Sequence, residues 1–258
     1  MKLALITLSP EGAAIAKQLA DHFTHADMFV HEGVTGVDEA RVFNSIISLT
    51  NDVFHRYEGL VYIVPCGVVV RAIAPLLEHK TQDPAVVVVD VCGRWAISLL
   101  SGHEGGANDL AISIANILGA DPVITTTTEA AKNLIVGVGC RRNTEASSII
   151  HAVRIAVDEI GGTLEKVRLL ASADVKSDEV GLKEAANFLG IALRYVPSDE
   201  IRATALEFEH SDFVMEKVDL PAVAEPCALL AGRRTRLILK KKKYDGVTVA
   251  IAQENCLW

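Results

Sequence analysis

The sequence predicts an α/β protein of two units, each with a largely parallel sheet, and two observations support this class. Short apolar runs that resemble buried strands alternate along the chain with segments of helical periodicity. In addition, half of the 258 residues are hydrophobic and only 5% are aromatic. Val, Ile, Leu and Ala, which supply most of the apolar residues, suit parallel strands that helices cover on both faces. A chain of this length can form two units with separate cores.

The first unit is expected to cover residues 1–130. Its strands are expected at 2–8, 27–31, 60–64, 85–89, 95–99 and 123–124, and its helices around 16–23, at 38–56, within 66–80 and at 107–118. Pro75 either kinks the helix within 66–80 or stands in the first turn of a later one. Residues 101–108 form a glycine-rich connection from a strand to a helix, and Gly119 is expected to end that helix.

The second unit is expected to cover residues 131–258, with very little linker near 129–133. Strands are expected at 134–138, 164–171, 235–240 and 246–252, and the last two can form a hairpin. One helix is expected to begin after the N-cap residue Thr144 and another near 176–179, with Gly190 ending the second.

Charge and hydropathy exclude several classes of protein. The formal net charge is −8, which argues against general nucleic-acid binding. No apolar stretch approaches the roughly 20 residues of a membrane-spanning helix, and the apolar run at the N-terminus is too short for a signal peptide. We therefore expect a cytoplasmic protein.

The cysteines predict neither a zinc site nor a disulfide framework. They are scattered, odd in number, and no pair has CxxC spacing. We expect most of them to be small buried packing residues. The five are Cys66, Cys92, Cys140, Cys227 and Cys256.

The 101–108 segment is the strongest candidate site. Two adjacent glycines precede the helix, and free amides at the positive end of a helix dipole suit anions. His103 is the natural candidate for a general acid or base, although it could equally cap the loop. The segment has neither the lysine of a P-loop nor the dinucleotide-binding GxGxxG pattern.

Other polar groups have a functional and a structural interpretation. Arg71 and Lys80 could hold ligand carboxylates, or they could be surface charges paired with Glu78 or Asp83. The threonines at 125–128 could offer hydroxyls to a ligand at the carboxyl end of a strand, or form an ordinary loop.

The motifs of the chain resemble those of the cobalt-precorrin-5A hydrolase family, the cobalamin biosynthesis proteins called CbiG. In the first unit the matching motifs are GVVVRAIAPLL at 67–77, Lys80, DPAV at 83–86, SLLSGH at 98–103, GGAN at 105–108 and LGADPVITT at 118–126. In the second unit they are VGVGCRR at 136–142, ASADVK at 171–176, VAEP at 223–226 and VTVA at 247–250. The second unit thus resembles the family's C-terminal domain, which CobE shares.

Two departures from the family pattern stand out. The usual ending Thr-Thr-Ala-Thr-Asp is Thr-Thr-Thr-Thr-Glu here, at 125–129. Family members also commonly have an extra segment between this motif and the C-terminal unit, whereas the two units are nearly fused in this chain. The sequence therefore resembles a compact member of the family.

The resemblance implies an enzyme of anaerobic cobalamin (vitamin B12) biosynthesis. It implies a hydrolase acting on a carbon–carbon bond, which opens the ring A δ-lactone of cobalt-precorrin-5A and releases acetaldehyde to give cobalt-precorrin-5B. No cofactor is implied, because cobalt arrives inside the substrate. Other pathway enzymes that exchange intermediates, and a second copy in a homodimer, stay open as partners.

The substrate that the resemblance implies is a flat apolar macrocycle with a fringe of carboxylates, so cations and hydroxyls are expected around it. The catalytic candidates are His103 as general base or acid, Asp90 orienting it, and Asp83, with Glu104 in reserve. The substrate-binding candidates are Arg71, Lys80, Ser101, Gly102, Gly105, Gly106, Asn108, Thr125, Thr126, Arg141, Lys176 and Glu225. The amides of 102–106 are expected to stabilise an oxyanion. The residues show no metal-ligand spacing.

Two other classes of function stay open. The protein could carry corrinoid intermediates between enzymes without catalysing a reaction, or it could be a regulatory module that binds an anion or a nucleotide. Formation of product separates the enzyme from the carrier. The sequence also leaves open whether the site lies between the two units or at a dimer interface.

Overall fold

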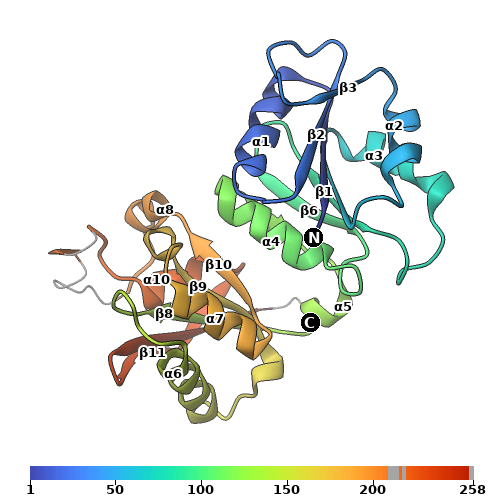
Figure 1. The fold of residues 1–258 in the computed structure, drawn as a ribbon. Coiled ribbons are helices and arrows are strands. Elements are labelled where there is room, and N and C mark those ends of the chain that lie inside the picture. Colours follow the sequence, from blue (N-terminus) through green and yellow to red (C-terminus); the bar gives the residue numbers. More distant parts are fainter. Residues whose placement is uncertain (209–214, 217–218, 256–258) are drawn as a thin grey trace. The chain divides into compact units, whose positions relative to one another are not determined.

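The structure is a computed structural model that describes residues 1–208, 215–216 and 219–255. The chain divides into two compact units, Met1–Thr126 and Thr127–Trp258, and each unit has its own sheet (Figure 1). Both units combine helices with mixed, largely parallel strands, so the predicted α/β class is confirmed. Within the described residues no helix is both long and apolar enough to span a membrane.

The first unit contains a seven-stranded sheet in the order β3-β2-β1-β4-β5-β6-β7. Its strands are β1 (Leu3–Thr7), β2 (Ala26–His31), β3 (Arg41–Phe43), β4 (Gly59–Ile63), β5 (Ala85–Val89), β6 (Trp95–Leu100) and β7 (Asp121–Val123). The first five strands are parallel to one another. Strand β6 is antiparallel to β5, and β7 is parallel to β6, so the direction of the sheet reverses at β6.

Helices cover both faces of this sheet. They are α1 (Pro10–Ala20), α2 (Ile46–Val53), α3 (Cys66–Ile73), the 3-10 turn η1 (Ala74–Leu76) and α4 (Ala107–Leu118). Helices α1 and α4 cover one face of the sheet, where Leu19 and Ile114 contribute to the core. Helices α2 and α3 cover the other face, where Val53 and Val69 pack near Tyr62 (Figure 1). Strands β1, β4 and β5 are buried along their whole length, as uninterrupted apolar runs predict.

The second unit contains a five-stranded sheet in the order β10-β9-β8-β12-β11. Its strands are β8 (Leu134–Gly139), β9 (Val167–Ala173), β10 (Ala192–Val196), β11 (Thr235–Tyr244) and β12 (Val247–Glu254). Its described helices are α5 (Thr127–Ala130), α6 (Ala146–Glu159), η2 (Leu164–Lys166), η3 (Asp174–Lys176), α7 (Val180–Leu189), α8 (Ser198–Ala203) and α10 (Ala224–Leu230). Strands β8, β9 and β10 are parallel, and the β11–β12 hairpin joins them through an antiparallel β8–β12 pair.

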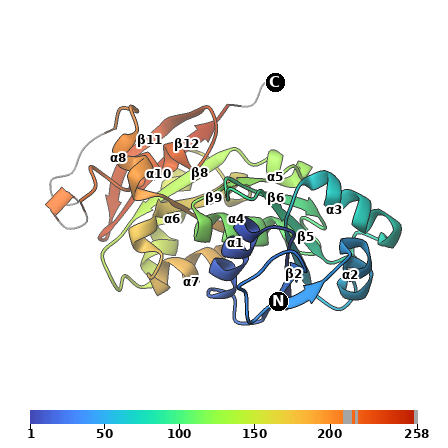
Figure 2. The same ribbon diagram turned by 90° about the horizontal axis from the view of Figure 1, so that it is seen from above.

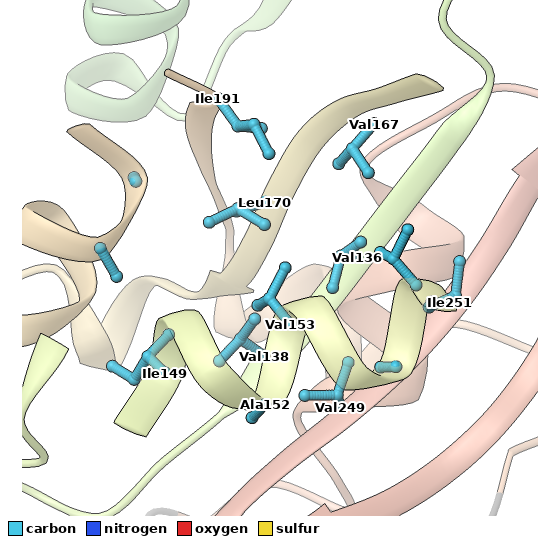
Figure 3. Packing of buried hydrophobic residues seen from close by; sticks show 14 of the residues in the cluster. Val136, Val138, Ile149, Ala152, Val153, Val167, Leu170, Ile191, Val249 and Ile251 are labelled. Atoms are coloured by element: carbon cyan, nitrogen blue, oxygen red, sulfur yellow. The ribbon is translucent and has the colours of Figure 1, made fainter. Parts of the chain in front are cut away.

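The main core of the second unit lies between its sheet and helices α6 and α7, which are neighbours (Figure 2). Val136, Val138 and Leu170 of the sheet meet Ile149 and Val153 of α6 there (Figure 3). Helix α10 packs closely against β8: a Cβ atom added to Gly137 would lie 1.9 Å from the carbonyl oxygen of Ala224. A side chain at this position would therefore separate α10 from the sheet.

Several local predictions are confirmed and others are wrong. The strand at 85–89 and the helix at 107–118 have the predicted bounds, and Gly119 adopts the left-handed conformation that ends the helix. The helix predicted at 38–56 is wrong in its first part, because Arg41–Phe43 pairs with β2 as a strand and buries Phe43.

Two more expectations about single residues are settled. Pro75 stands in the short η1 turn after α3. Thr144 does not cap α6, because Glu145 holds that position and the Thr144 hydroxyl donates to the carbonyl of Arg141 at 2.8 Å. Four cysteines are described, and all four are free thiols; Cys256 lies outside the described residues.

Candidate functional site

The glycine-rich connection after β6 lies at the amino-terminal edge of the parallel strands. Leu100, the last residue of β6, pairs with Val86 near the start of β5. Residues 101–106, which we call the His103 loop, therefore lie beside the residues that precede β5. The hydroxyl of Ser101 donates to the carbonyl oxygen of Asp83 at 2.9 Å, which joins the two segments.

The His103 loop uses several of its own amides. The amides of Gly105 and Ala107 both donate to the carbonyl of Ser101, at 3.0 and 3.2 Å, and the amide of Asn108 donates to the carbonyl of Gly102 at 3.0 Å. The expectation that the amides of 102–106 bind an oxyanion is therefore wrong for Gly105. Three amides at the start of α4 are therefore used within the loop itself, and the expectation for the other amides of 102–106 stays a prediction.

Close packing explains the glycines of the loop. A Cβ atom on Gly102 would lie 2.8 Å from both Asn108 Oδ1 and Thr126 Cγ2, and one on Gly105 would lie 2.5 Å from the Cβ of Ser101. Gly106 has a φ of 83°, a left-handed conformation that favours glycine. Close packing and the left-handed conformation thus account for these three glycines as parts of the loop, and their predicted contact with a substrate stays a prediction.

Asn108 and Thr126, predicted to bind substrate, bond to each other. Asn108 is buried in the first turn of α4, and its Nδ2 atom donates to Thr126 Oγ1 at 3.0 Å. Its Oδ1 atom accepts from the Ser98 hydroxyl of β6 at 2.8 Å. Sequence reasoning missed Ser98, although it is only three residues before Ser101. Thr125 is exposed, and no bond of its side chain to another described residue is present.

Charged groups gather on the exposed side of the loop. Lys80 Nζ lies 2.7 Å from Glu104 Oε1. The hydrogen bond to Lys80 lowers the pKa of the Glu104 carboxyl, and the charge of His103 adds a small effect in the same direction. The same pair raises the pKa of Lys80. His103 is exposed and makes no hydrogen bond within the described part of the chain.

Asp83 differs from these exposed groups. It is buried, and its Oδ1 atom accepts the amide of Glu78 at 3.0 Å. This bond closes the turn before β5, so Asp83 supports the segment that carries Lys80. The structure therefore gives the carboxylate a role in folding the loop rather than a free position beside a substrate.

Asp90 lies at the opposite end of the strands from His103, so it cannot orient the imidazole as expected. It follows β5, while His103 follows β6, and the two strands run antiparallel. Five or six strand residues separate the two ends, roughly 15–20 Å at about 3.3 Å per residue. The Asp90 carboxylate instead accepts the amides of Cys92, Arg94 and Trp95 in the β5–β6 turn.

The pKa of Asp90 agrees with this structural role. Burial alone would raise the pKa, but the hydrogen bonds from Trp95, the Arg94 side chain and the turn amides lower it overall.

Arg71 also lies apart from the His103 loop. It is an exposed residue of α3, and its guanidinium lies near Gly67 at the start of that helix, which follows β4.

The candidates of the second unit are mostly engaged in its own fold. Lys176 is buried, with Nζ 3.5 Å from Glu179 Oε1. Glu179 also accepts the amide of Asn143 at 2.9 Å, so it joins the connections that follow β8 and β9. Sequence analysis placed Glu179 only at the start of a helix; its spacing of three from Lys176 was the available signal.

Glu225 and Arg141 differ from each other in exposure. Glu225 is buried and accepts the amide of Lys241 at 2.9 Å, whereas Arg141 is exposed. Cys140 is partly buried beside Lys176, and burial raises the pKa of its thiol. No group of three or more potential metal ligands is present among the described residues.

The fold and the site define a class of protein: two α/β units, of which the first presents a tightly folded loop with exposed charged side chains. A family model described as Cobalamin synthesis G N-terminal matches residues 48–129, and one described as Cobalamin synthesis G C-terminus matches residues 134–252. The chain therefore belongs to the cobalamin synthesis G (CbiG) family.

Named relatives agree with this assignment. The chain is 26% identical to the cobalt-precorrin-5A hydrolase of Priestia megaterium, with 96% of this chain and 94% of the relative covered. It is 33% identical to the cobalt-precorrin-5A hydrolase of Salmonella typhimurium, with 87% of this chain and 61% of the relative covered. It is also 30% identical to protein CobE of a Sinorhizobium species, over 49% of this chain and 83% of the relative.

The alignments also bear on the length of the chain. The match to the Priestia megaterium relative extends over 352 positions, whereas this chain has 258 residues. That relative therefore has residues inside the aligned span that this chain lacks.

Proposed function

We propose that the protein is a cobalt-precorrin-5A hydrolase and that the His103 loop carries its reaction. The observation that supports this most strongly is the similarity, over 96% of the chain, to a relative with that name. The exposed His103, Lys80 and Glu104 side chains give the first unit the groups that such a reaction needs. Because this chain is shorter than its relative, the proposal also means that the additional residues are not required for the chemistry.

The overall reaction consumes one water molecule. Water adds to the lactone carbonyl, the ring C–O bond breaks, and a carboxylate and an alcohol result. The alcohol then loses its proton, the bond between its carbon and the macrocycle breaks, and acetaldehyde leaves. The macrocycle carbon keeps the electron pair and takes up a proton. No oxidant or reductant is needed, so proton transfer is the main task of the protein.

His103 is the base in this proposal. Its imidazole is exposed and unbonded within the described residues, and imidazole is well suited to exchange protons near neutral pH. Glu104, the neighbouring carboxylate, supplies a negative charge beside the imidazole. It makes no hydrogen bond to His103 among the described residues, so it does not take over the orienting role expected of Asp90. Lys80, whose side chain is 70% exposed, is positioned to bind a carboxylate of the substrate fringe.

The test is to give pure protein cobalt-precorrin-5A under anaerobic conditions and to measure acetaldehyde together with substrate binding. The parent is expected to release acetaldehyde, and His103→Gln is expected to lose about 100-fold or more of the rate while still binding. His151→Gln is a matched control, because His151 is an exposed histidine in the second unit.

Each outcome separates the hypotheses. Binding by the parent without release of acetaldehyde would indicate a carrier and contradict the proposed activity. Release at an unchanged rate by His103→Gln would keep the activity but remove His103 as the base. Equal losses in His103→Gln and His151→Gln would show that the loss is not specific to the loop.

A further inference from the structure

Asn108 joins four parts of the first unit through three hydrogen bonds. Its amide donates to the carbonyl of Gly102 at 3.0 Å, so it holds the His103 loop. Its Oδ1 atom accepts from Ser98 of β6 at 2.8 Å, and its Nδ2 atom donates to Thr126, after β7, at 3.0 Å. Asn108 itself belongs to α4. We call Ser98, Asn108 and Thr126 the Asn108 clamp.

The side chain of Asn108 is inaccessible to a large substrate. Asn108 is only 6% exposed, and both ends of its side-chain amide have partners. Gly102 packs directly against it, because a Cβ atom there would lie 2.8 Å from Asn108 Oδ1 and from the methyl carbon of Thr126. A displaced amide would therefore move Gly102, and His103 is the next residue along the chain.

We propose that Asn108 is a positioning residue, which fixes the place of His103 through Gly102 and does not touch the substrate. This inference rests on the proposed function for its effect on catalysis. A buried polar group with all its partners in place fixes one geometry, whereas a partly satisfied group permits several. Small displacements of a catalytic group can slow a reaction strongly, so a residue that fixes the position of His103 affects the rate.

The clamp also has a topological consequence. Thr126 is the last residue of the first unit, and the next residue begins α5 of the second. The same hydrogen bond that supports the His103 loop therefore fixes the point at which the chain leaves the first unit.

Thr126 offers the sharpest test, because its hydroxyl can be removed without changing its shape. Thr126→Val keeps the methyl group that packs on Gly102 but loses the acceptor for Asn108, while Thr126→Ser keeps the hydroxyl. For acetaldehyde release we expect kcat of Thr126→Val to fall about tenfold to 100-fold with KM within about twofold. Ser98→Ala should resemble Thr126→Val, and Thr126→Ser should keep the parental kcat.

Hydrogen exchange supplies a readout without substrate. The amides of Gly105, Ala107 and Asn108 should exchange faster in Thr126→Val than in the parent, and at parental rates in Thr126→Ser. Ser113→Ala is the matched control, because Ser113 is on the same helix and its hydroxyl donates to the carbonyl of Asp109 on the exposed side. It should leave both kcat and exchange unchanged.

The outcomes distinguish this inference from the proposed function. If the parent releases acetaldehyde and Thr126→Val keeps the parental kcat, Asn108 is not a positioning residue. Failure of Thr126→Ser to restore kcat would also overturn the inference, because the hydroxyl would then be irrelevant. If the parent releases no acetaldehyde, the proposed function fails, and unchanged exchange in Thr126→Val would overturn the clamp independently.

Discussion

Lys80 and Glu104 form an ion pair of 2.7 Å that joins the segment before β5 to the His103 loop. The same two segments are joined again by the hydrogen bond from Ser101 to the carbonyl of Asp83. The two contacts differ in accessibility, since Ser101 and Asp83 are buried while the Lys80 side chain is 70% exposed. The inner contact therefore holds the loop, and a carboxylate ligand can compete with Glu104 for Lys80 in the outer one.

The first prediction concerns this exposed pair. In Lys80→Gln the pKa of Glu104 should rise towards its ordinary value, because the hydrogen bond that lowers it is lost. A lowered pKa in the folded state stabilises the protein above the ordinary carboxyl pKa, and this stabilisation disappears as the pH falls through the lowered value. An NMR titration of the Glu104 carboxyl measures the change; identical curves for parent and variant would exclude the pair in solution.

The second prediction concerns Asp90. Asp90→Asn should lower the free energy of unfolding by about 1–2 kcal/mol, because hydrogen bonds from Trp95, Arg94 and Cys92 to a charged acceptor are weakened. Since the pKa of Asp90 is lowered, the difference in free energy of unfolding between Asp90→Asn and the parent should shrink as the pH falls through that lowered value.

The position of Asp90 at the other edge of the sheet also predicts its effect on catalysis. The rate of acetaldehyde release per folded molecule should not change in Asp90→Asn. Denaturant unfolding and the release assay measure the two quantities, with Asp52→Asn, an exposed residue of α2, as control. A selective loss of rate at full stability would return Asp90 to the catalytic site.

The third prediction concerns alkaline pH. Tyr62 is buried and bonded to Thr50 at 3.0 Å, and burial raises the pKa of its hydroxyl to about 12. The neutral phenol is thus favoured in the folded state, which contributes stability below pH 10 that is lost as the pH rises towards about 12. Absorbance at alkaline pH and unfolding curves should follow this dependence.

Substitution of the pair gives an independent check. Tyr62→Phe should cost about 1 kcal/mol or more at neutral pH, because it leaves the Thr50 hydroxyl buried without this partner. The double variant with Thr50→Val should recover part of the loss, since both polar groups are then absent. A double variant less stable by the sum of both single losses would argue against the hydrogen bond.

The fourth prediction compares two glycines of β8. Gly137→Ala should destabilise the second unit by about 3 kcal/mol, because the new methyl group would overlap the backbone of α10. Gly139→Ala should have little effect, since the nearest atoms to its Cβ would lie 3.6–3.8 Å away in ordinary contact. Thermal unfolding measures both, and equal stabilities would mean that α10 packs less closely on β8.

Local structure could be predicted where signals lie close together in the sequence. The helix at 107–118 follows from a stripe of apolar residues between glycines, and the strand at 85–89 from an uninterrupted run of apolar residues. Strand β10 and helix α10 were missed. Their positions depend on partners distant in the sequence, since β10 pairs with β9 and α10 packs on β8.

The direction of β6 determines which candidate residues lie together, and the sequence contained a signal for that direction. Only residues 90–94 connect β5 to β6, and parallel strands need a crossover of about a dozen residues. The connection therefore required an antiparallel pair, which separates Asp90 from His103. By contrast, the bond between Asn108 and Thr126 depends on side-chain geometry across eighteen positions of the chain, which no spacing rule predicts.

The reversal at β6 also affects how the protein should be handled. Since the His103 loop lies at the edge where the parallel strands begin, the side chain of Met1 is near both Gly59 and Gly106. An affinity tag fused to Met1 would emerge beside that loop. Purified protein for activity measurements should therefore have any amino-terminal tag removed, because a flexible peptide there would occupy space beside the loop that the proposed function assigns to the substrate.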